Sequence, residues 1–348
     1  MAKVPNNFSS TLRLLRTFSP AGVYLLMLLL VSCTPDRFHV NVDNIDVHVN
    51  IDRFDKDLFD TLSDSVQGRI SYLSHKYGSF FDMFSFRIIA PARGIADPGF
   101  SYNLSSFTTH PDMREAYNQC QKVFPDLSWL ENEMSLAFRH YKYYFPEKNV
   151  PRVIAFMSGF NYSVAVDSDF VAIGLERYLG PDCVFYPSLQ YPKYMTAHMD
   201  KPYITPDCMR AWALSEWPQQ GKKNFLGEII YNGKLLYFLR SMMPDLPDAI
   251  LFRYTPEKLE WCNDHEAYVW AELIDEKLLF ITEEKKIVEW TSEAPFVQGF
   301  TREAPDRVGN WVGYQIVSAY MERENVSLDQ LMGEQDAQMI LEKSHYKP

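Results

Sequence analysis

Histidine is the first residue type to test for chemistry, because metal-dependent hydrolysis needs it at a fixed spacing. A zincin-type peptidase carries H-E-x-x-H on a helix, where two histidines bind the metal and the glutamate polarises its water. No two of the eight histidines are four residues apart. His265 is followed by Glu266, but Val269 stands where the second histidine is needed. The strong form of this motif is therefore absent.

Nucleophilic and phosphate chemistry also lack their usual motifs. The chain has no Gly-x-Ser-x-Gly elbow and neither of the common glycine-rich phosphate loops. Cys208, near the start of a predicted helix, is open to activation by the helix dipole, but a buried or disulfide-bonded cysteine is commoner. Beyond Cys33, four cysteines allow three full pairings, and the sequence does not choose between them: Cys120, Cys183, Cys208 and Cys262.

Cys33 is the residue whose chemistry the sequence predicts most directly. Three basic and no acidic residues precede an apolar run at residues 22–31, which is shorter than the roughly 20 residues that cross a bilayer. This pattern is typical of a secretory signal peptide, here residues 1–32. Leu30-Val31-Ser32-Cys33 resembles the lipobox of bacterial lipoproteins, which predicts cleavage before Cys33 and acylation, such as palmitoylation, of the new terminus. An ordinary signal peptide or an uncleaved anchor is the alternative.

The composition fits a globular body on a short tether at residues 33–37. Hydrophobic residues make up 47% of the chain and aromatic residues 15%, so a large core is expected. The formal net charge of −11 argues against nucleic acid as a partner, because phosphate binding needs an excess of basic residues. The predicted partners are the membrane, through the lipid, and other envelope proteins.

The elements that must position any site follow from apolar spacing. Residues 38–54 alternate like a strand, and the pattern from Asp57 to Leu73 has helical spacing. Further helices are predicted at 112–124, 126–145, from Thr205, at 224–242, from Thr255 and from Pro305. A buried strand is predicted at 152–157 and a hairpin at 162–166 and 170–173. The sequence thus predicts a single α+β domain over residues 38–348, mostly helical with a small central mixed sheet.

Several sequence blocks resemble the gliding motility-associated lipoprotein GldB family. The lipobox is followed by the block from Phe225 to Phe238, FLGEIIYNGKLLYF, and by a C-terminal run from Gly309 to Pro348. Pro305, Arg307, Gly309, Trp311 and Gly313 match the family's P-x-R-x-G-x-W-x-G segment. The resemblance implies a lipoprotein of the cell envelope, on the outer membrane and facing the periplasm, that is associated with gliding motility and its neighbouring secretion apparatus.

The family is in turn distantly similar to predicted zinc proteases, which implies a zincin-like scaffold. In those proteases a glutamate on a second helix supplies the third metal ligand, whereas Asn232 stands at the matching position here. The helix at 208–217 lies where the first motif would be and carries no matching histidine. The resemblance therefore implies a pseudoenzyme without a metal or other cofactor, apart from the lipid.

On such a scaffold the helix pair 208–217 and 224–242 is expected to flank a peptide groove beside the hairpin edge. The residues expected to line it are Arg210, Trp212, Asn232, Lys234, Tyr237, His265 and Glu266. Lys234 is expected to pair with Glu266 or with a partner's carboxylate. The alternative is that Trp212 and Tyr237 belong to the core and that Lys234 is structural.

Two other functions stay open from the sequence. One is a hydrolase with an unusual metal set, such as His198 or His265 with Glu228 or Glu266. The other is a purely structural lipoprotein that braces an envelope complex through exposed aromatic patches.

Overall fold

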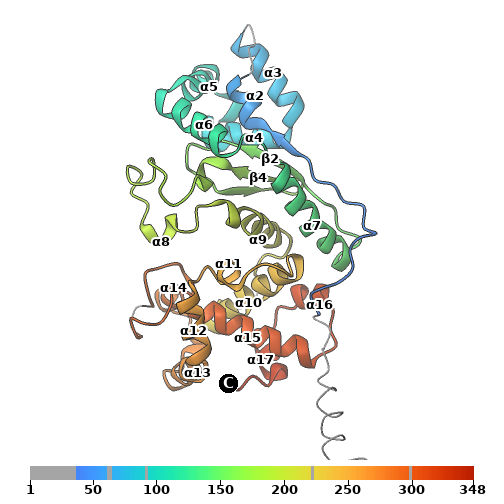
Figure 1. Cartoon of the computed structure of the whole chain (residues 1–348), viewed down its shortest axis with the longest axis vertical. Helices are drawn as coiled ribbons and strands as arrows, with labels where there is room; N and C mark the ends of the chain where they lie inside the picture. The colour runs from blue at the N-terminus through green and yellow to red at the C-terminus, as the bar shows by residue number, and fades with distance from the viewer. Residues whose placement is uncertain (1–36, 61–64, 91–92, 221–222, 298–299) are drawn as a thin grey trace, which may run out of the picture. The chain divides into compact units, whose positions relative to one another are not determined.

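The computed structural model describes residues 37–60, 65–90, 93–220, 223–297 and 300–348 (Figure 1). The predicted signal peptide, Cys33 and most of the tether lie outside these residues. The chain divides into two units, residues 1–40 and residues 41–348. Among the described helices, none combines the length and the apolar character that a membrane crossing requires.

A four-stranded mixed sheet forms the centre of residues 41–348. Its order is β1-β2-β4-β3, with β1 parallel to β2, β2 parallel to β4, and β3 antiparallel to β4. The bounds are β1 Ile51–Arg53, β2 Arg152–Phe156, β3 Val164–Val166 and β4 Phe170–Gly174. The structure thus confirms the predicted small mixed sheet and its hairpin.

The predicted strand at 38–54 is largely wrong, because only β1 at its end joins the sheet. Residues 49–51 lie along helix α7 (Ser128–Tyr144). Side chains of α7 accept hydrogen bonds from the backbone N–H groups of this segment. Val49 N donates to Ser135 Oγ at 2.9 Å, and Ile51 N donates to Glu131 Oε1 at 2.9 Å. Alternating apolar residues indicate one buried side, but they do not specify whether a strand or a helix covers it.

Helices of the first half lie on one face of the sheet, except the last of them, α7, which contacts α9 (Ile204–Glu216) and α10 (Phe225–Met242) (Figure 1). They are α2 Phe54–Asp60, α3 Val66–Tyr77, α4 Ser79–Phe84, the π-helical turn η1 Ser85–Ile89, the 3₁₀ turn η2 Gly94–Ala96, α5 Phe100–Thr109, α6 Pro111–Val123 and α7 Ser128–Tyr144. The predicted helix from Asp57 falls on α2 and α3. Phe80 of α4 packs edge-on against Phe156 and Phe170 of the strands, with ring centroids 5.4 and 5.3 Å apart. This aromatic cluster anchors the helices to the sheet.

The second half is helical, as predicted. Its elements are η3 Leu175–Tyr178, α8 Lys193–Thr196, η4 Lys201–Tyr203, α9 Ile204–Glu216, α10 Phe225–Met242, α11 Asp248–Phe252, α12 Pro256–Asp264, α13 Glu266–Asp275, η5 Leu278–Phe280, α14 Glu284–Thr291, α15 Val308–Arg323, α16 Leu328–Gly333 and α17 Ala337–Ser344. Helix α9 packs against β3 and β4 on the face opposite α2 and α4, and α10 follows it (Figure 1).

Helices α10 and α15 cross at a pair of glycines. A Cβ atom on Gly313 would lie 1.8 Å from Ile229 O, and one on Gly233 would lie 2.3 Å from the backbone of Gly313. Only glycine permits this approach, since any side chain would overlap the facing backbone. This close packing at Gly233 and Gly313 fixes α10 between α9 and α15.

Candidate functional site

A buried polar bridge joins α9 to α10. Arg210 Nη2 donates to Asn232 Oδ1 at 2.8 Å. Asn232 Nδ2 donates in turn to Glu228 Oε1 at 2.9 Å and to Glu228 O at 3.0 Å. Burial lowers the pKa of Arg210 to about 10, and the positive charge of Arg253 acts in the same direction. The guanidinium of Arg210 is thus held inside the helix pair by a neutral amide.

Arg210 also lines a cavity of about 280 Å³, which we name the arginine cavity. Its lining comes from the first turns of α9 and α15, the end of α11, and one side of α10. The charged lining residues are Asp207, Arg210, Arg253, Glu293 and Arg307. The apolar wall is made by Leu236, Leu239, Ile250, Leu251, Phe252 and Trp311. The cavity therefore combines a charged end with an apolar side.

The three arginines of this cavity differ in their partners. Arg253 forms an ion pair with Asp207, and Arg307 Nε lies 2.8 Å from Asp306 Oδ2. No carboxylate of the described residues lies within ion-pair distance of Arg210, and the bond to Asn232 is the single hydrogen bond of its guanidinium there. Arg210 is thus the arginine of the cavity that has no carboxylate partner in the described part of the chain.

Backbone conformation adds to the unusual character of this cavity. Arg253 and Arg307 both have left-handed backbone angles, with φ of 56° and 57°. A non-glycine residue in this region carries strain that the surrounding structure must offset, and such residues cluster at functional sites. Here the two strained positions end α11 and begin α15, and they aim two arginines at one cavity.

A smaller cavity of about 230 Å³ adjoins the first, and Asp207, Arg253 and Glu293 line both. It extends to Ser163, which directly precedes β3, and to His198. His198 Nδ1 lies 2.8 Å from Glu293 Oε1. Burial raises the pKa of Glu293, but the His198 hydrogen bond and nearby positive charges outweigh it, so the pKa is lowered. The two cavities together connect the arginines with the edge of the sheet.

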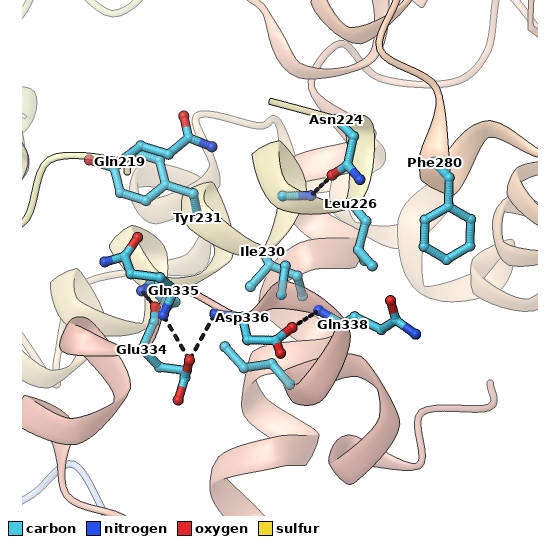
Figure 2. Close-up of a pocket in the computed structure, with 14 residues that line it drawn as sticks. Gln219, Asn224, Leu226, Ile230, Tyr231, Phe280, Glu334, Gln335, Asp336 and Gln338 are labelled. Atoms are coloured by element: carbon cyan, nitrogen blue, oxygen red, sulfur yellow. Dashed lines mark hydrogen bonds between the residues drawn. The ribbon is translucent and has the colours of Figure 1, made fainter. Parts of the chain in front are cut away.

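A third cavity, of about 550 Å³, lies on the opposite face of α10 and is named the lysine cavity after Lys234 (Figure 2). Leu226, Ile230 and Lys234 are spaced four apart and so share one face of α10. Its remaining polar lining is mostly uncharged or already hydrogen-bonded. Figure 2 shows Asn224 bonded to the first turn of α10, and Asp336 bonded to Gln338 N at the start of α17.

Lys234 does not pair with Glu266, which corrects the expectation from the sequence. Its Nζ donates to Met332 O at 3.0 Å and to Glu334 O at 2.6 Å, where α16 ends. Burial lowers the pKa of Lys234 to about 8. Glu266 accepts a hydrogen bond from Tyr346 Oη at 2.8 Å instead. Lys234 is therefore a structural residue that ties α10 to the last helices.

The other predicted groove residues do not come together. Trp212 and Tyr237 are only 2% and 4% exposed and belong to the core. His265 stacks on Trp261, with ring centroids 4.5 Å apart, and lies with Glu266 at the junction of α12 and α13. Of the seven residues, Arg210 and Lys234 line cavities, but on different faces of α10.

Sequence reasoning missed most of the charged cavity lining. Asp207, Arg253, Glu293 and Asn310 come from four separate segments, and no local spacing connects them. Arg307 could have been identified from the sequence as a family residue, because it belongs to the C-terminal segment that carries the family resemblance. From the sequence alone, that segment indicates the family and gives no sign that it lines a site.

The residues considered for catalysis have other partners. His198 is paired with Glu293, and Glu228 with Asn232. Within the described part of the chain, no group of three or more His, Cys, Asp and Glu side chains is arranged to hold a metal ion. The four described cysteines are free, and Cys208 is buried with a pKa raised well above its usual value. Cys208 is thus not an activated thiol.

Comparisons with known proteins agree with the resemblance seen in the sequence blocks. A search of curated proteins and a search of solved structures gave no match. A family model described as gliding motility protein GldB matches residues 35–348, which include every described residue of both cavities on α10. The chain therefore belongs to the GldB family of gliding motility proteins.

Proposed function

We propose that the protein is a lipid-anchored, non-catalytic binding factor of the gliding-motility and secretion machinery of the cell envelope. Family membership indicates a lipoprotein associated with gliding motility. The acylation of Cys33, the place on the outer membrane facing the periplasm, and the assembly with envelope partners extend that assignment. In this proposal the body binds a partner through the arginine cavity and holds no metal.

The observation that carries the proposal is the hydrogen bond between Arg210 and Asn232. The resemblance to zinc proteases puts the metal ligands of such a scaffold on the helices that correspond to α9 and α10. Here a guanidinium and an amide meet at that place. A guanidinium stays protonated at neutral pH, so it donates hydrogen bonds and cannot ligate a metal. Its charge would also repel a divalent cation in a setting where burial strengthens electrostatic forces.

The hydrogen bonds that join Arg210, Asn232 and Glu228 also support a binding role for the protein. Removal of one partner from a buried hydrogen-bonded set leaves the other unsatisfied, which destabilises the protein. Arg210, Asn232 and Glu228 satisfy one another along one side, while the rest of the Arg210 guanidinium borders the cavity. Such an arrangement fixes a cation in place without committing it to an internal carboxylate, which suits recognition of a partner.

Hydrolysis is the activity to test. The full-length lipoprotein, extracted in detergent, is incubated with an unstructured protein such as casein, with and without added Zn²⁺, and the products are read by mass spectrometry. We expect no cleavage above that of a buffer blank. Cleavage that requires Zn²⁺ and is lost in Glu293→Gln or His198→Ala would contradict the proposal and favour the hydrolase with unusual ligands.

A further inference from the structure

We propose that the arginine cavity binds the C-terminal residue of an extended peptide, with the terminal carboxylate on Arg210 and an apolar side chain on the cavity wall. This inference rests on the proposed function, since it names the ligand class of the binding factor. Four features of the cavity support it: its hydrogen-bond donors, the net charge of its lining, its size and its position near the edge of the sheet.

The donors in the cavity fit a carboxylate. Arg210 uses Nη2 for Asn232, and the remaining N–H groups of its guanidinium have no partner among the described residues. A guanidinium presents its donors as a planar fork that matches the two oxygens of a carboxylate. Because Arg210 lines the cavity, a ligand carboxylate there would gain a charge-assisted contact with a cation that no internal acid neutralises.

The start of α15 adds positive electrostatic potential. This helix has 16 residues, its N-cap is Arg307, and no side chain caps it. The helix dipole places partial positive charge at this end. Asn310 and Trp311 of the first turn line the cavity, and their N–H groups donate to Arg307 O at 2.8 and 3.3 Å, so the helix contributes its dipole there and not free donors. An anion in the cavity therefore faces both a guanidinium and a helix N-terminus.

The net charge of the lining favours a monoanion. Three arginines and two carboxylates line the cavity, which leaves one positive charge in excess. A carboxylate balances that charge. A phosphate monoester carries close to two negative charges at neutral pH and would lie near Asp207 and Glu293, which repel it. The charge balance thus selects a carboxylate over a phosphate.

The size and the wall of the cavity fit one apolar residue. Its volume of about 280 Å³ is below the range for drug-sized ligands, roughly 300–1,000 Å³. Leu236, Leu239 and Ile250 are among the apolar side chains of its wall. Asn310 lines the cavity and is 8% exposed, and its Oδ1 is buried with no hydrogen-bond partner in the described part of the chain.

The rest of the peptide has a path to the sheet. The smaller cavity continues past the Arg253–Asp207 ion pair to Ser163, immediately before β3. β3 is the last strand of the described sheet and pairs with β4 alone. An extended peptide can add to such an edge through backbone hydrogen bonds. The carboxylate pocket would then set the register of the added strand.

The test uses two probes on the full-length protein in detergent micelles. They are the pentapeptide Ac-Ala-Ala-Ala-Ala-Leu with a free carboxylate and the same peptide with a C-terminal amide. Titration calorimetry is expected to show binding of the free acid and at least tenfold weaker binding of the amide. Equal affinity of the two peptides, or no binding of either, would overturn the inference.

Variants locate the interaction. Arg210→Met is expected to weaken binding of the free acid at least tenfold, whereas Gln338→Ala, a substitution in the lysine cavity, is expected to leave it unchanged. Thermal unfolding of each variant checks that it folds. If Arg210→Met does not fold, the difference in affinity between the free-acid and the amide peptide for the natural protein still tests the inference. Unchanged binding by a folded Arg210→Met would contradict the assignment.

A competition arm separates carboxylate from phosphate. At matched ionic strength, acetate is expected to displace the free-acid peptide at lower concentration than inorganic phosphate. Stronger displacement by phosphate would overturn the choice of ligand. Failure of peptide binding is also distinct from failure of the proposed function, because Zn²⁺-dependent cleavage of casein is read in a separate assay.

Discussion

A cation lies against each of two opposite faces of α10, a buried lysine of the helix itself on one and a part-buried arginine of α9 on the other, and the two are held in opposite ways. On one face Lys234 is 3% exposed and donates to two backbone carbonyls that end α16. On the other face Arg210 donates to Asn232 and has no carboxylate partner in the described structure. A buried charge whose donors are used by its own fold supports that fold, whereas one with spare donors beside a cavity is available to a ligand.

The glycine crossing that separates the two cavities gives the largest expected effect. Gly313→Ala would force a Cβ against Ile229 O and push α15 away from α10, so we expect a loss of about 3 kcal/mol in the free energy of unfolding. Urea denaturation measures it. The matched control is Gly333→Ala, where nothing lies within 4 Å of the new Cβ, and its expected change is within about 0.5 kcal/mol. Equal stability of the two variants would refute the close crossing.

Substitution of Lys234 is expected to lower the stability of the protein without changing its affinity for the peptide. Lys234→Met leaves the carbonyls of Met332 and Glu334 without their donor, and we expect a loss of about 1 kcal/mol in unfolding free energy. Peptide affinity should stay within twofold of the natural protein. Lys343→Met, at a half-exposed lysine 3.5 Å from Glu324, is the control and should change stability by less than about 0.5 kcal/mol. A stable Lys234→Met that fails to bind peptide would reverse the roles of the two faces.

The pH dependence of the same variant gives a further test of the role of Lys234. The pKa of Lys234 is about 8 in the folded chain, below its ordinary value of 10.5. Between these two pH values the unfolded chain binds the proton that the folded chain has released, so stability due to this group rises with pH. The neutral amine keeps two N–H donors for the two carbonyls. The stability difference between the natural protein and Lys234→Met should therefore widen above pH 8, and a narrowing difference would contradict the assignment.

The parts of the fold that local chemistry determines were predictable. The predicted helix starts at Thr255 and at residue 224 fall on the N-caps of α12 and α10. The predicted start at Thr205 is slightly wrong, because α9 already begins at Ile204. The hairpin of β3 and β4 also follows from a short pattern. The segment before β1 was mispredicted, because its alternation reflects contact with α7 and not strand pairing.

The candidate site was predictable only in part, because its residues come from distant segments. Arg210 and Asn232 were predicted to line one groove, and they meet across α9 and α10. Arg253 and Glu293 complete the cavity from α11 and from the segment after α14, and neither lies in a local motif. The sequence also groups Lys234 with Arg210 and Asn232, but the helical period turns Lys234 to the opposite face of α10.

We propose that the guanidinium of Arg210 lies at the position that corresponds to the metal of a zinc protease. Elemental analysis of the full-length protein, purified without chelator and without a metal-affinity tag, measures its zinc content. We expect far less than one zinc per chain, both for the natural protein and for His198→Ala. About one zinc per chain in the natural protein, lost in His198→Ala or Glu293→Gln, would refute the proposal.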